Sequence, residues 1–493
     1  MMSDSEEWEG SGMLQIENLQ EISPWCWEIP VSGEMLVPGR IFSDREFVTR
    51  AGQEHALEQV RNVACLPGIE MASLAMPDIH WGYGFAIGGV AAFRLEDGII
   101  SPGGVGYDIA CGVRLIRSNL QVPEVEKAIP DLVHEFSRSV PAGVGRHGKV
   151  RLGHRELESL MTQGAPWLIS QGYGWPEDID SIEDGGVLEG ANPGLISSRA
   201  RERGFAQQGT LGAGNHFLEV QRVDEIFDEA AAQAFGVFQD QLCIMVHSGS
   251  RGLGHQICSE YVKIMGGAAA RAGISLPDRQ LACAPIQSPE GRDYYAAMAC
   301  AVNFARGNRQ VMTHLVRQSC EYVFKTSAEK LGLDLVYDVA HNVAKFEEHE
   351  TGSGPKMLCV HRKGATRSFP AGHPDIPPKY RAVGQPVIVP GDMGTASYLL
   401  KGTEKAMTES FGSTCHGAGR VMGRRAAKRA IRGHELKARL EAQGITIRAG
   451  RTSTLAEEAP EAYKDIDRVV EVCHQAGLSH KVARLRPLGV VKG

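Results

Sequence analysis

Residues 101–114 read SPGGVGYDIACGVR, a glycine-rich loop that leads directly into an apolar run. Asp108 and Cys111 lie three residues apart in this stretch, so a carboxylate and a thiolate can face one ion. Such a pair suits a borderline transition metal such as zinc, manganese, iron or cobalt. The other interpretation is a buried cysteine beside a capping aspartate. The pair alone leaves both interpretations open.

Three histidines occur where apolar segments meet polar loops. His216 lies in GAGNHF, His247 ends the run LCIMVH, and His341 ends LVYDVAH. A single histidine in such a place is more often a hydrogen-bonded core residue than a ligand. Three of them, together with Asp108 and Cys111, favour a metal site. If Cys111 is shared, the five ligands suffice for two ions, an arrangement used in phosphoryl chemistry. Imidazole does not select the metal by itself.

A fourth histidine lies in another glycine-rich stretch, STCHGAGR at 413–420, and we expect His416 to open a long basic helix over 416–443. Small residues and helix N-terminal N–H groups let a phosphate approach, so His416 could attack a nucleotide phosphorus. It could also be a further metal ligand or an ordinary helix residue. The basic side chains of this helix form either a solvated face or a contact for an anionic polymer. They are Arg420, Arg424, Arg425, Lys428, Arg429, Arg432, Lys437 and Arg439.

The remaining pattern predicts an α+β fold. Strand-like apolar runs do not alternate regularly with helix-like stretches, which argues against a doubly wound sheet. The expected strands are 85–95, 113–118, 242–247, 335–341, 357–361 and 386–390, and the expected helices are 255–272, 291–330, 416–443 and 457–476. We expect a disordered acidic tail over 1–12 and one catalytic domain over 13–493, with 172–194 as a surface excursion.

Composition narrows the class of protein. The net charge is -7, so any nucleic-acid partner must be held by local basic patches. The 11 cysteines show no disulfide framework, which favours a reducing compartment. The acidic start lacks the features of a signal peptide, and no apolar run is long enough to span a membrane. We therefore expect a cytoplasmic protein without a membrane partner.

Eight motifs in order resemble the RtcB family of RNA ligases. They run from SPGGVGYDIACGVR through GTLGAGNHFLEVQ, MVHSGSRGLGH, AHNVAK, HRKGATR, PGDMGTASY and HGAGR to the final VVKG. The resemblance implies a ligase that depends on GTP and two Mn²⁺ ions and joins RNA 2′,3′-cyclic-phosphate or 3′-phosphate ends to 5′-hydroxyl ends. It implies a single large domain around a central two-metal cleft. The RNA would be broken or spliced, including tRNA halves, and an activator of the archease type is a possible partner of a monomeric enzyme.

The resemblance also assigns residue roles. Asp108, Cys111 and His216 would hold one Mn²⁺, while Cys111, His247 and His341 would hold the other. His416 would become guanylylated, and Arg251 and Lys363 would lie near the RNA ends. The implied GTP contacts are Asn215, His216, Phe217, Leu218, Glu219, His341, Asn342, Pro390, Gly391, Asp392, Met393, Ser397, His416, Gly417, Ala418, Gly419, Tyr463 and Lys492.

Among these residues, Glu219, Ser397 and Lys492 would read the guanine base. A carboxylate accepts from the N1–H and N2–H₂ edge of guanine, and a cation donates to O6. One residue departs from the family pattern, because Asp392 replaces the hydroxyl residue of the Pro-Gly-Ser/Thr-Met-Gly turn. A carboxylate there would repel phosphates unless it points elsewhere.

Two other functions remain open: a two-metal phosphohydrolase or cyclic phosphodiesterase, and a non-catalytic metal- and RNA-binding protein.

Overall fold

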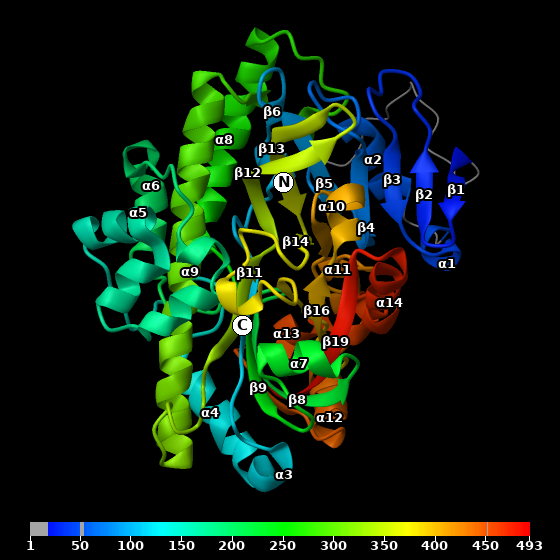
Figure 1. Cartoon of the computed structure of the whole chain (residues 1–493). Coiled ribbons are helices and arrows are strands. Elements are labelled where there is room, and N and C mark those ends of the chain that lie inside the picture. Colours follow the sequence, from blue (N-terminus) through cyan, green and yellow to red (C-terminus); the bar gives the residue numbers. More distant parts are fainter. Residues whose placement is uncertain (1–17, 50–53, 451) are drawn as a thin grey trace.

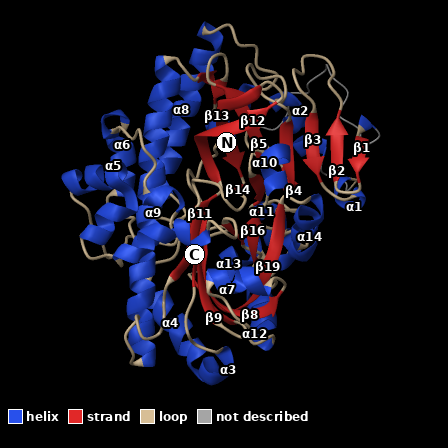
Figure 2. Cartoon of the chain, in the orientation of Figure 1, coloured by secondary structure: helices blue, strands red, loops and turns tan. Residues whose placement is uncertain are grey.

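The computed structural model describes residues 18–49, 54–450 and 452–493. The predicted tail over 1–12 lies outside these described residues. Strands from distant parts of the sequence combine into sheets that helices flank (Figures 1 and 2), which confirms the α+β prediction.

The first large sheet has the strand order β1-β2-β3-β4-β5-β13-β12. Neighbouring strands pair antiparallel except β3 and β4, which are parallel. Along β12 buried and exposed residues alternate, as expected for an edge strand with one face in water. The strands are β1 (Gln20–Ser23), β2 (Cys26–Ile29), β3 (Gly39–Phe42), β4 (Ser73–His80), β5 (Ile87–Arg94), β13 (Gly354–Lys363) and β12 (Asn342–Thr351).

The second large sheet has the order β11-β7-β9-β8-β19-β16-β15, and β18 pairs parallel with β19. Its strands β11, β7 and β9 are buried along their whole length, so their sequences are mainly apolar, and the charged residues Arg114 of β7 and Asp338 of β11 form an ion pair. The strands are β11 (Leu335–Ala340), β7 (Gly112–Ile116), β9 (Leu242–Ser248), β8 (Phe217–Ile226), β19 (Ser479–Lys492), β16 (Ser397–Gly402), β15 (Pro386–Val389) and β18 (Thr446–Ala449). Two short pairs complete the described strands: β6 (Ile99–Ile100) with β10 (Ala284–Pro285), and β14 (Ala365–Arg367) with β17 (Ser413–Cys415).

Helix α9 is the longest helix of the described chain and extends along the sheets (Figure 1). It buries not only apolar residues but also Asn308, Arg309 and Arg317. The helices are α1 (Arg45–Val48), α2 (Glu54–Val63), α3 (Val122–Val125), α4 (Ile129–Ser139), α5 (His154–Ser170), α6 (Ser198–Gly204), α7 (Glu229–Phe235), α8 (Arg251–Arg271), α9 (Pro289–Phe324), α10 (Glu404–Ser410), α11 (Arg424–Ala430), α12 (Gly433–Ala442), α13 (Thr452–Leu455) and α14 (Ile466–Ala476). Within the described ranges, no helix combines the length and apolarity that crossing a membrane requires.

The six expected strands are present with shifted ends, and α8 and α9 match two expected helices. The single helix expected over 416–443 is wrong: a loop follows β17, and α11 and α12 are separate. The helix expected over 457–476 begins only at Ile466. The surface excursion expected over 172–194 is also wrong in part, because Asp178 and Glu183 are buried and pair with cations.

Candidate metal and nucleotide site

Four predicted metal ligands lie at the same end of four neighbouring strands. Cys111 directly precedes β7, and His216 directly precedes β8. His247 lies at the end of β9, and His341 separates β11 from β12. Because β7 runs antiparallel to β9 and β11, and β8 runs antiparallel to β9, the start of one strand lies beside the end of the next. The topology therefore collects residues that are far apart in the sequence.

The ligand atoms form two groups that share Cys111. One group is Cys111, His247 and His341, and the other is Asp108, Cys111 and His216, with the atoms of each group within 4.8 Å of one another. The Cys111 Sγ lies 3.3 Å from the Nε2 atoms of both His216 and His247. The Nε2 of His247 lies 3.3 Å from that of His341, and the Nε2 of His216 lies 2.8 Å from the Asp108 carboxylate.

Backbone hydrogen bonds hold the two ligand-bearing loops together. The N–H of Ala110 donates to the carbonyl of Asn342 (2.7 Å), and the N–H of His341 donates to the carbonyl of Cys111 (2.9 Å). Ala110 has a φ of 53°, an uncommon conformation for a residue with a Cβ. This turn directs Asp108 and Cys111 toward the same point.

The donor set fits divalent metal ions. Burial, aided by the neighbouring histidines, lowers the pKa of His247 and His341 well below the usual range, so both rings are neutral. Their facing Nε2 atoms then need a shared proton or a cation between them. The Nδ1 of His216 lies 3.0 Å from the Leu211 carbonyl, an arrangement that leaves Nε2 for a metal. Carboxylate, thiolate and imidazole together are ligands for a borderline metal.

His416 lies beside the second ligand group, with its ring centroid 4.9 Å from that of His341. It follows β17 in a loop and does not open a helix, so the predicted helix N-terminus is absent there. Instead, one oxygen of Asp78 lies 2.6 Å from the His416 Nδ1 and accepts from the N–H groups of His416 (3.0 Å) and Gly417 (3.2 Å). A carboxylate on Nδ1 favours the tautomer whose Nε2 carries the free lone pair.

Sequence analysis missed Asp78. It lies in β4 and is fully buried. The sequence did offer one signal, a charged residue inside the apolar stretch SLAMPDIH. An ionised carboxylate is rarely buried without a specific partner, so Asp78 could have been expected to bind one.

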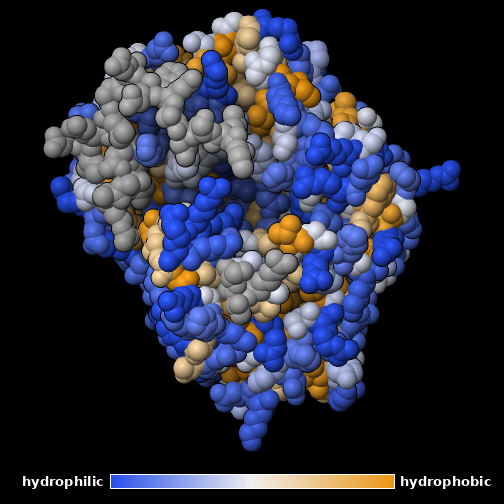
Figure 3. Space-filling view, turned by 180° about the vertical axis from the view of Figure 1, so that it is seen from behind, coloured by the Kyte–Doolittle hydropathy of each residue, from blue (hydrophilic) through white to orange (hydrophobic). Residues whose placement is uncertain are grey.

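Both ligand groups open into a cavity of about 800 Å³. The view opposite to Figure 1 shows hydrophilic residues around a central hollow (Figure 3). Besides Asp108, Cys111, His247 and Lys363, the cavity is lined by most predicted nucleotide residues: Asn215, His341, Asn342, Pro390, Gly391, Asp392, His416, Gly417, Ala418, Gly419, Tyr463 and Lys492. The predicted residues outside this lining are His216, Phe217, Leu218, Glu219, Met393, Ser397 and Arg251.

The proposed base-reading residues are nevertheless close together beneath the cavity. β8 pairs with β19, so Phe217 lies opposite Lys492, whose Nζ is 5.7 Å from the Phe217 ring centroid. Gln221, which sequence analysis missed, donates to Glu219 (2.8 Å) and to Ser397 (3.1 Å). The other Glu219 oxygen is buried without a hydrogen-bond partner in the described chain.

The charge of Glu219 is perturbed by its surroundings. Burial and, to a smaller extent, Asp392 raise its pKa to about 8, against the opposing effects of Gln221 and Lys492. Burial also lowers the pKa of Lys492. The free buried oxygen is placed to accept a hydrogen bond from a ligand, while the raised pKa favours the protonated carboxyl group when no ligand is bound.

Asp392 directs its carboxylate back into its own turn. One oxygen accepts from the Gly394 N–H (2.9 Å), and the other accepts from the Thr395 hydroxyl (2.8 Å). Burial raises the pKa of Asp392, whereas its bonds to Gly394 and Thr395 lower it. The residue that departs from the family pattern therefore acts as a turn former in this structure.

The two predicted RNA-end residues occupy different positions. Arg251 lines a second cavity of about 630 Å³, which shares Asp108 and Asn215 with the first. Lys363 is buried in the wall of the first cavity and donates to the carbonyls of Tyr83 (2.5 Å) and Phe85 (2.9 Å). Burial lowers the pKa of Lys363 to about 7.

Most of the basic side chains over 420–439 form ion pairs. Arg420 and Arg424 bind Glu458, and Lys428 binds Glu457. Arg432, Lys437 and Arg439 also have glutamate partners. Arg425 and Arg429, on the exposed side of α11, have no ion pair among the described residues.

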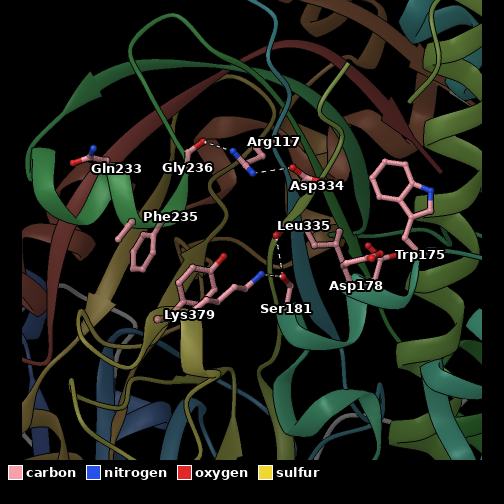
Figure 4. Close-up of a pocket in the computed structure, with 13 residues that line it drawn as sticks. Arg117, Trp175, Asp178, Ser181, Gln233, Phe235, Gly236, Asp334, Leu335 and Lys379 are labelled. Atoms are coloured by element: carbon pink, nitrogen blue, oxygen red, sulfur yellow. Dashed lines mark hydrogen bonds and ion pairs between the residues drawn. The ribbon is translucent and has the colours of Figure 1, made fainter. Parts of the chain in front are cut away.

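A smaller cavity of about 300 Å³ lies between the 3₁₀ helix η4 (Pro176–Ser181), α7 and the loop before β15 (Figure 4). Its charged groups are satisfied locally, since Arg117 pairs with Asp334 (2.8 Å) and Lys379 bonds to the Ser181 hydroxyl. None of the predicted site residues lines it. The chemistry is therefore concentrated in the two cavities that meet at Asp108.

Comparison with known proteins identifies the class. The family model described as tRNA-splicing ligase RtcB matches residues 59–493. The chain is 53% identical over 482 residues to a tRNA-splicing ligase RtcB of Thermococcus kodakarensis, covering 98% of this chain and 100% of that one. It is 54% identical over 477 residues to that of Archaeoglobus fulgidus, covering 96% and 99%. It is 51% identical over 438 residues to the RNA-splicing ligase RtcB of Mycobacterium tuberculosis, covering 88% and 100%.

The chain is thus an RNA ligase by class. It contains a cluster of candidate metal ligands next to His416, which Asp78 holds in place. The chain belongs to the RtcB family of tRNA-splicing ligases, as its motifs predicted.

Proposed function

We propose that this RNA ligase depends on GTP and Mn²⁺ and joins RNA 2′,3′-cyclic-phosphate or 3′-phosphate ends to 5′-hydroxyl ends. The observation that carries the proposal is the position of His416: its ring lies 4.9 Å from that of His341, in one cavity with two ligand groups that share Cys111. A nucleophile and sites for two cations are the parts that transfer of a nucleotidyl group requires.

The two ions would be held by the ligand groups already described, with Cys111 in both. When bound, such ions neutralise phosphate charge and act as Lewis acids. The fold fixes Cys111, His216, His247 and His341 because they lie at strand ends of one sheet, and Asp108 lies in the loop just before β7. This placement keeps the phosphates near His416.

The reaction would run in three steps, and His416 would take part in the first two. Its Nε2 forms a bond to the α-phosphorus of GTP, and pyrophosphate leaves. The P–N bond then breaks as a 3′-phosphate oxygen of the RNA takes the guanylate. Finally, the 5′-hydroxyl attacks the 3′-phosphorus and GMP leaves. Asp78 supports these steps because its carboxylate stabilises the positive charge that develops on the imidazole. Cyclic ends would first be hydrolysed to the 3′-phosphate in the same cavity.

Guanine would be selected by Glu219, Ser397 and Lys492, with Phe217 and Tyr463 as aromatic contacts. The unpartnered Glu219 oxygen supports this role. Tyr463 lines the cavity and is held by Glu458 and Arg420. Asn215, Asn342 and the 390–393 turn would contact phosphates and ribose, with Gly417, Ala418 and Gly419 allowing close approach. Leu218 packs its side chain in the core, so any contact from it would come from its backbone.

The RNA ends would approach Arg251 and Lys363 where the two cavities meet. We propose tRNA splicing or the repair of cleaved RNA as the setting, in the cytoplasm, with the enzyme acting as a monomer. An activator of the archease type would help turnover. Membership of a family of tRNA-splicing ligases supports RNA as the substrate.

Intact-mass spectrometry tests the nucleophile. With GTP and Mn²⁺ the wild-type protein should gain one guanylate, which acid should remove because a phosphoramidate is acid-labile. His416→Ala should gain none, whereas His474→Ala, a change at a histidine of α14 that lines neither cavity, should be modified normally. ATP in place of GTP should give little adduct. A metal-loaded wild type without an adduct would favour the phosphohydrolase or cyclic phosphodiesterase instead.

A further inference from the structure

We propose that Arg309 is a positioning residue for the metal centre, binding the backbone of two ligand-bearing segments from below. The inference rests on the metal centre of the proposed function and adds a group outside the ligand set. Arg309 lies in α9 and is fully buried. It is therefore a permanent cation that solvent does not reach.

The guanidinium of Arg309 joins three segments. Its Nη1 donates to the carbonyl of Ala110 (2.9 Å), the residue before Cys111, and to the carbonyl of Ser248 (3.0 Å), the residue after His247. Its Nε and Nη2 donate to the two oxygens of Asp338, each at 2.7 Å. Asp338 is in β11, whose next residues lead to His341. One side chain thus fixes the spacing of the three segments that carry a whole ligand group.

Asn308 extends the same support to the other ligand group. Its side chain accepts from the Thr210 N–H and donates to the Thr210 carbonyl, both at 3.1 Å. It also donates to the Gly249 carbonyl at 3.3 Å. Thr210 begins the loop that leads to His216. Consecutive residues of one buried helix therefore hold the loops around both groups.

Lysine cannot replace Arg309 in this role. Four bonds leave the planar guanidinium in different directions, toward the carboxylate on one side and the two carbonyls on the other. A lysine keeps the charge, but its donors radiate from a single nitrogen and cannot span these acceptors. The shape of the Arg309 guanidinium, and not only its charge, would therefore set the separation of Cys111 from His247.

Arg114 provides a matched control. It is also fully buried and also donates to Asp338 at 2.7 Å. Its remaining bonds go to Gln310 (2.7 Å) and Thr313 (3.0 Å), side chains of α9 that hold no ligand segment. The two arginines are thus equally buried, carry the same charge and both bind Asp338. Only Arg309 also binds the backbone next to candidate metal ligands.

The test measures metal binding directly, without RNA or GTP. Wild type, Arg309→Lys, Arg309→Met and Arg114→Met are titrated with Mn²⁺ by calorimetry and with Co²⁺ by absorption, which reports the thiolate–metal contact. We expect about 10–100-fold weaker binding in the Arg309 variants, as for other groups that orient ligands, and a shifted Co²⁺ spectrum. Arg114→Met should lose thermal stability but keep wild-type metal affinity and spectrum.

The outcomes separate this inference from the proposed function. If wild type binds no metal, the proposed centre itself is wrong. If wild type binds two ions and Arg309→Lys, or a folded Arg309→Met, binds them equally well, Arg309 has no positioning role. Equal losses in Arg114→Met would also overturn the inference, because they would reflect the general stability of the fold. Arg309→Lys keeps a positive charge opposite the buried Asp338, so we expect it to fold. It therefore provides the test if Arg309→Met fails to fold.

Discussion

The affinity for guanine nucleotides should rise with pH through the titration of Glu219. Burial raises the pKa of this side chain to about 8. Guanine N1–H and N2–H₂ are donors, so only the ionised carboxylate can accept from both. Glu219 is protonated below its folded-state pKa, which means that nucleotide binding near pH 7 must release a proton.

The size of the effect follows from the ionised fraction. With a pKa of about 8, roughly a tenth of the molecules carry the carboxylate at pH 7.0 and about three quarters at pH 8.5, so the apparent affinity should rise about eightfold, or about 1.2 kcal/mol. Over this range the phosphate of GMP is already ionised, since its second pKa is about 6. Its titration therefore adds little to the change.

Calorimetric titration with GMP, which cannot guanylylate His416, measures this affinity. Glu219→Gln is the control: it should bind more weakly and lose the rise with pH, and any remaining slope would report Lys492, whose pKa burial lowers. Proton release is measured at pH 7.0 in two buffers of different ionisation enthalpy. A wild-type affinity that stays constant or falls toward pH 8.5, or a glutamine variant that follows the wild type, would refute the role of Glu219.

Three further results are expected. Cys111→Ala should lose both metal ions by elemental analysis and His341→Ala mainly one, since only the thiolate belongs to both groups; two retained ions in Cys111→Ala would disprove the shared ligand. Asp78→Asn should slow guanylylation of His416 by up to about 10⁴-fold, as when a catalytic histidine loses the carboxylate that sets its tautomer, and rapid-quench rates at saturating GTP would detect it. Neutralising both Arg425 and Arg429 should reduce the salt dependence of single-stranded RNA binding by about 1.4 in log–log slope if each contacts a phosphate, and an unchanged slope would leave them as solvated charges.

The cluster of candidate metal ligands was predictable because four of them stand where an apolar run begins or ends. Strand ends in one sheet meet, so the positions of Cys111, His247 and His341 in the sequence already indicated a common site. The residues that hold His416 and the ligand-bearing segments in place were not predictable. Asp78 and Arg309 are remote in sequence from the residues they hold, and only the folded arrangement reveals their contacts.

The single helix expected over 416–443 is absent because a tertiary contact overrides the local helical propensity. Residues such as Ala427 and Lys428 favour helix, so the stretch has helical propensity. The segment before them must bring His416 onto Asp78, and Gly419 adopts a φ of +72° to do so. A Cβ at Gly419 would lie 2.2 Å from the Asp78 carbonyl oxygen. Tertiary contact with β4 therefore replaces helix with a loop.

The order of strands in the second sheet has a consequence for synthesis on the ribosome. Strands β7, β8, β9 and β11, which carry four candidate metal ligands at their ends, are adjacent in the sheet and complete once residue 341 has been made. Strands β16 and β15 join them only through β19, the last strand of the chain. Since early segments of a growing chain fold first, we expect a nascent chain to be able to capture metal before it can recognise a nucleotide.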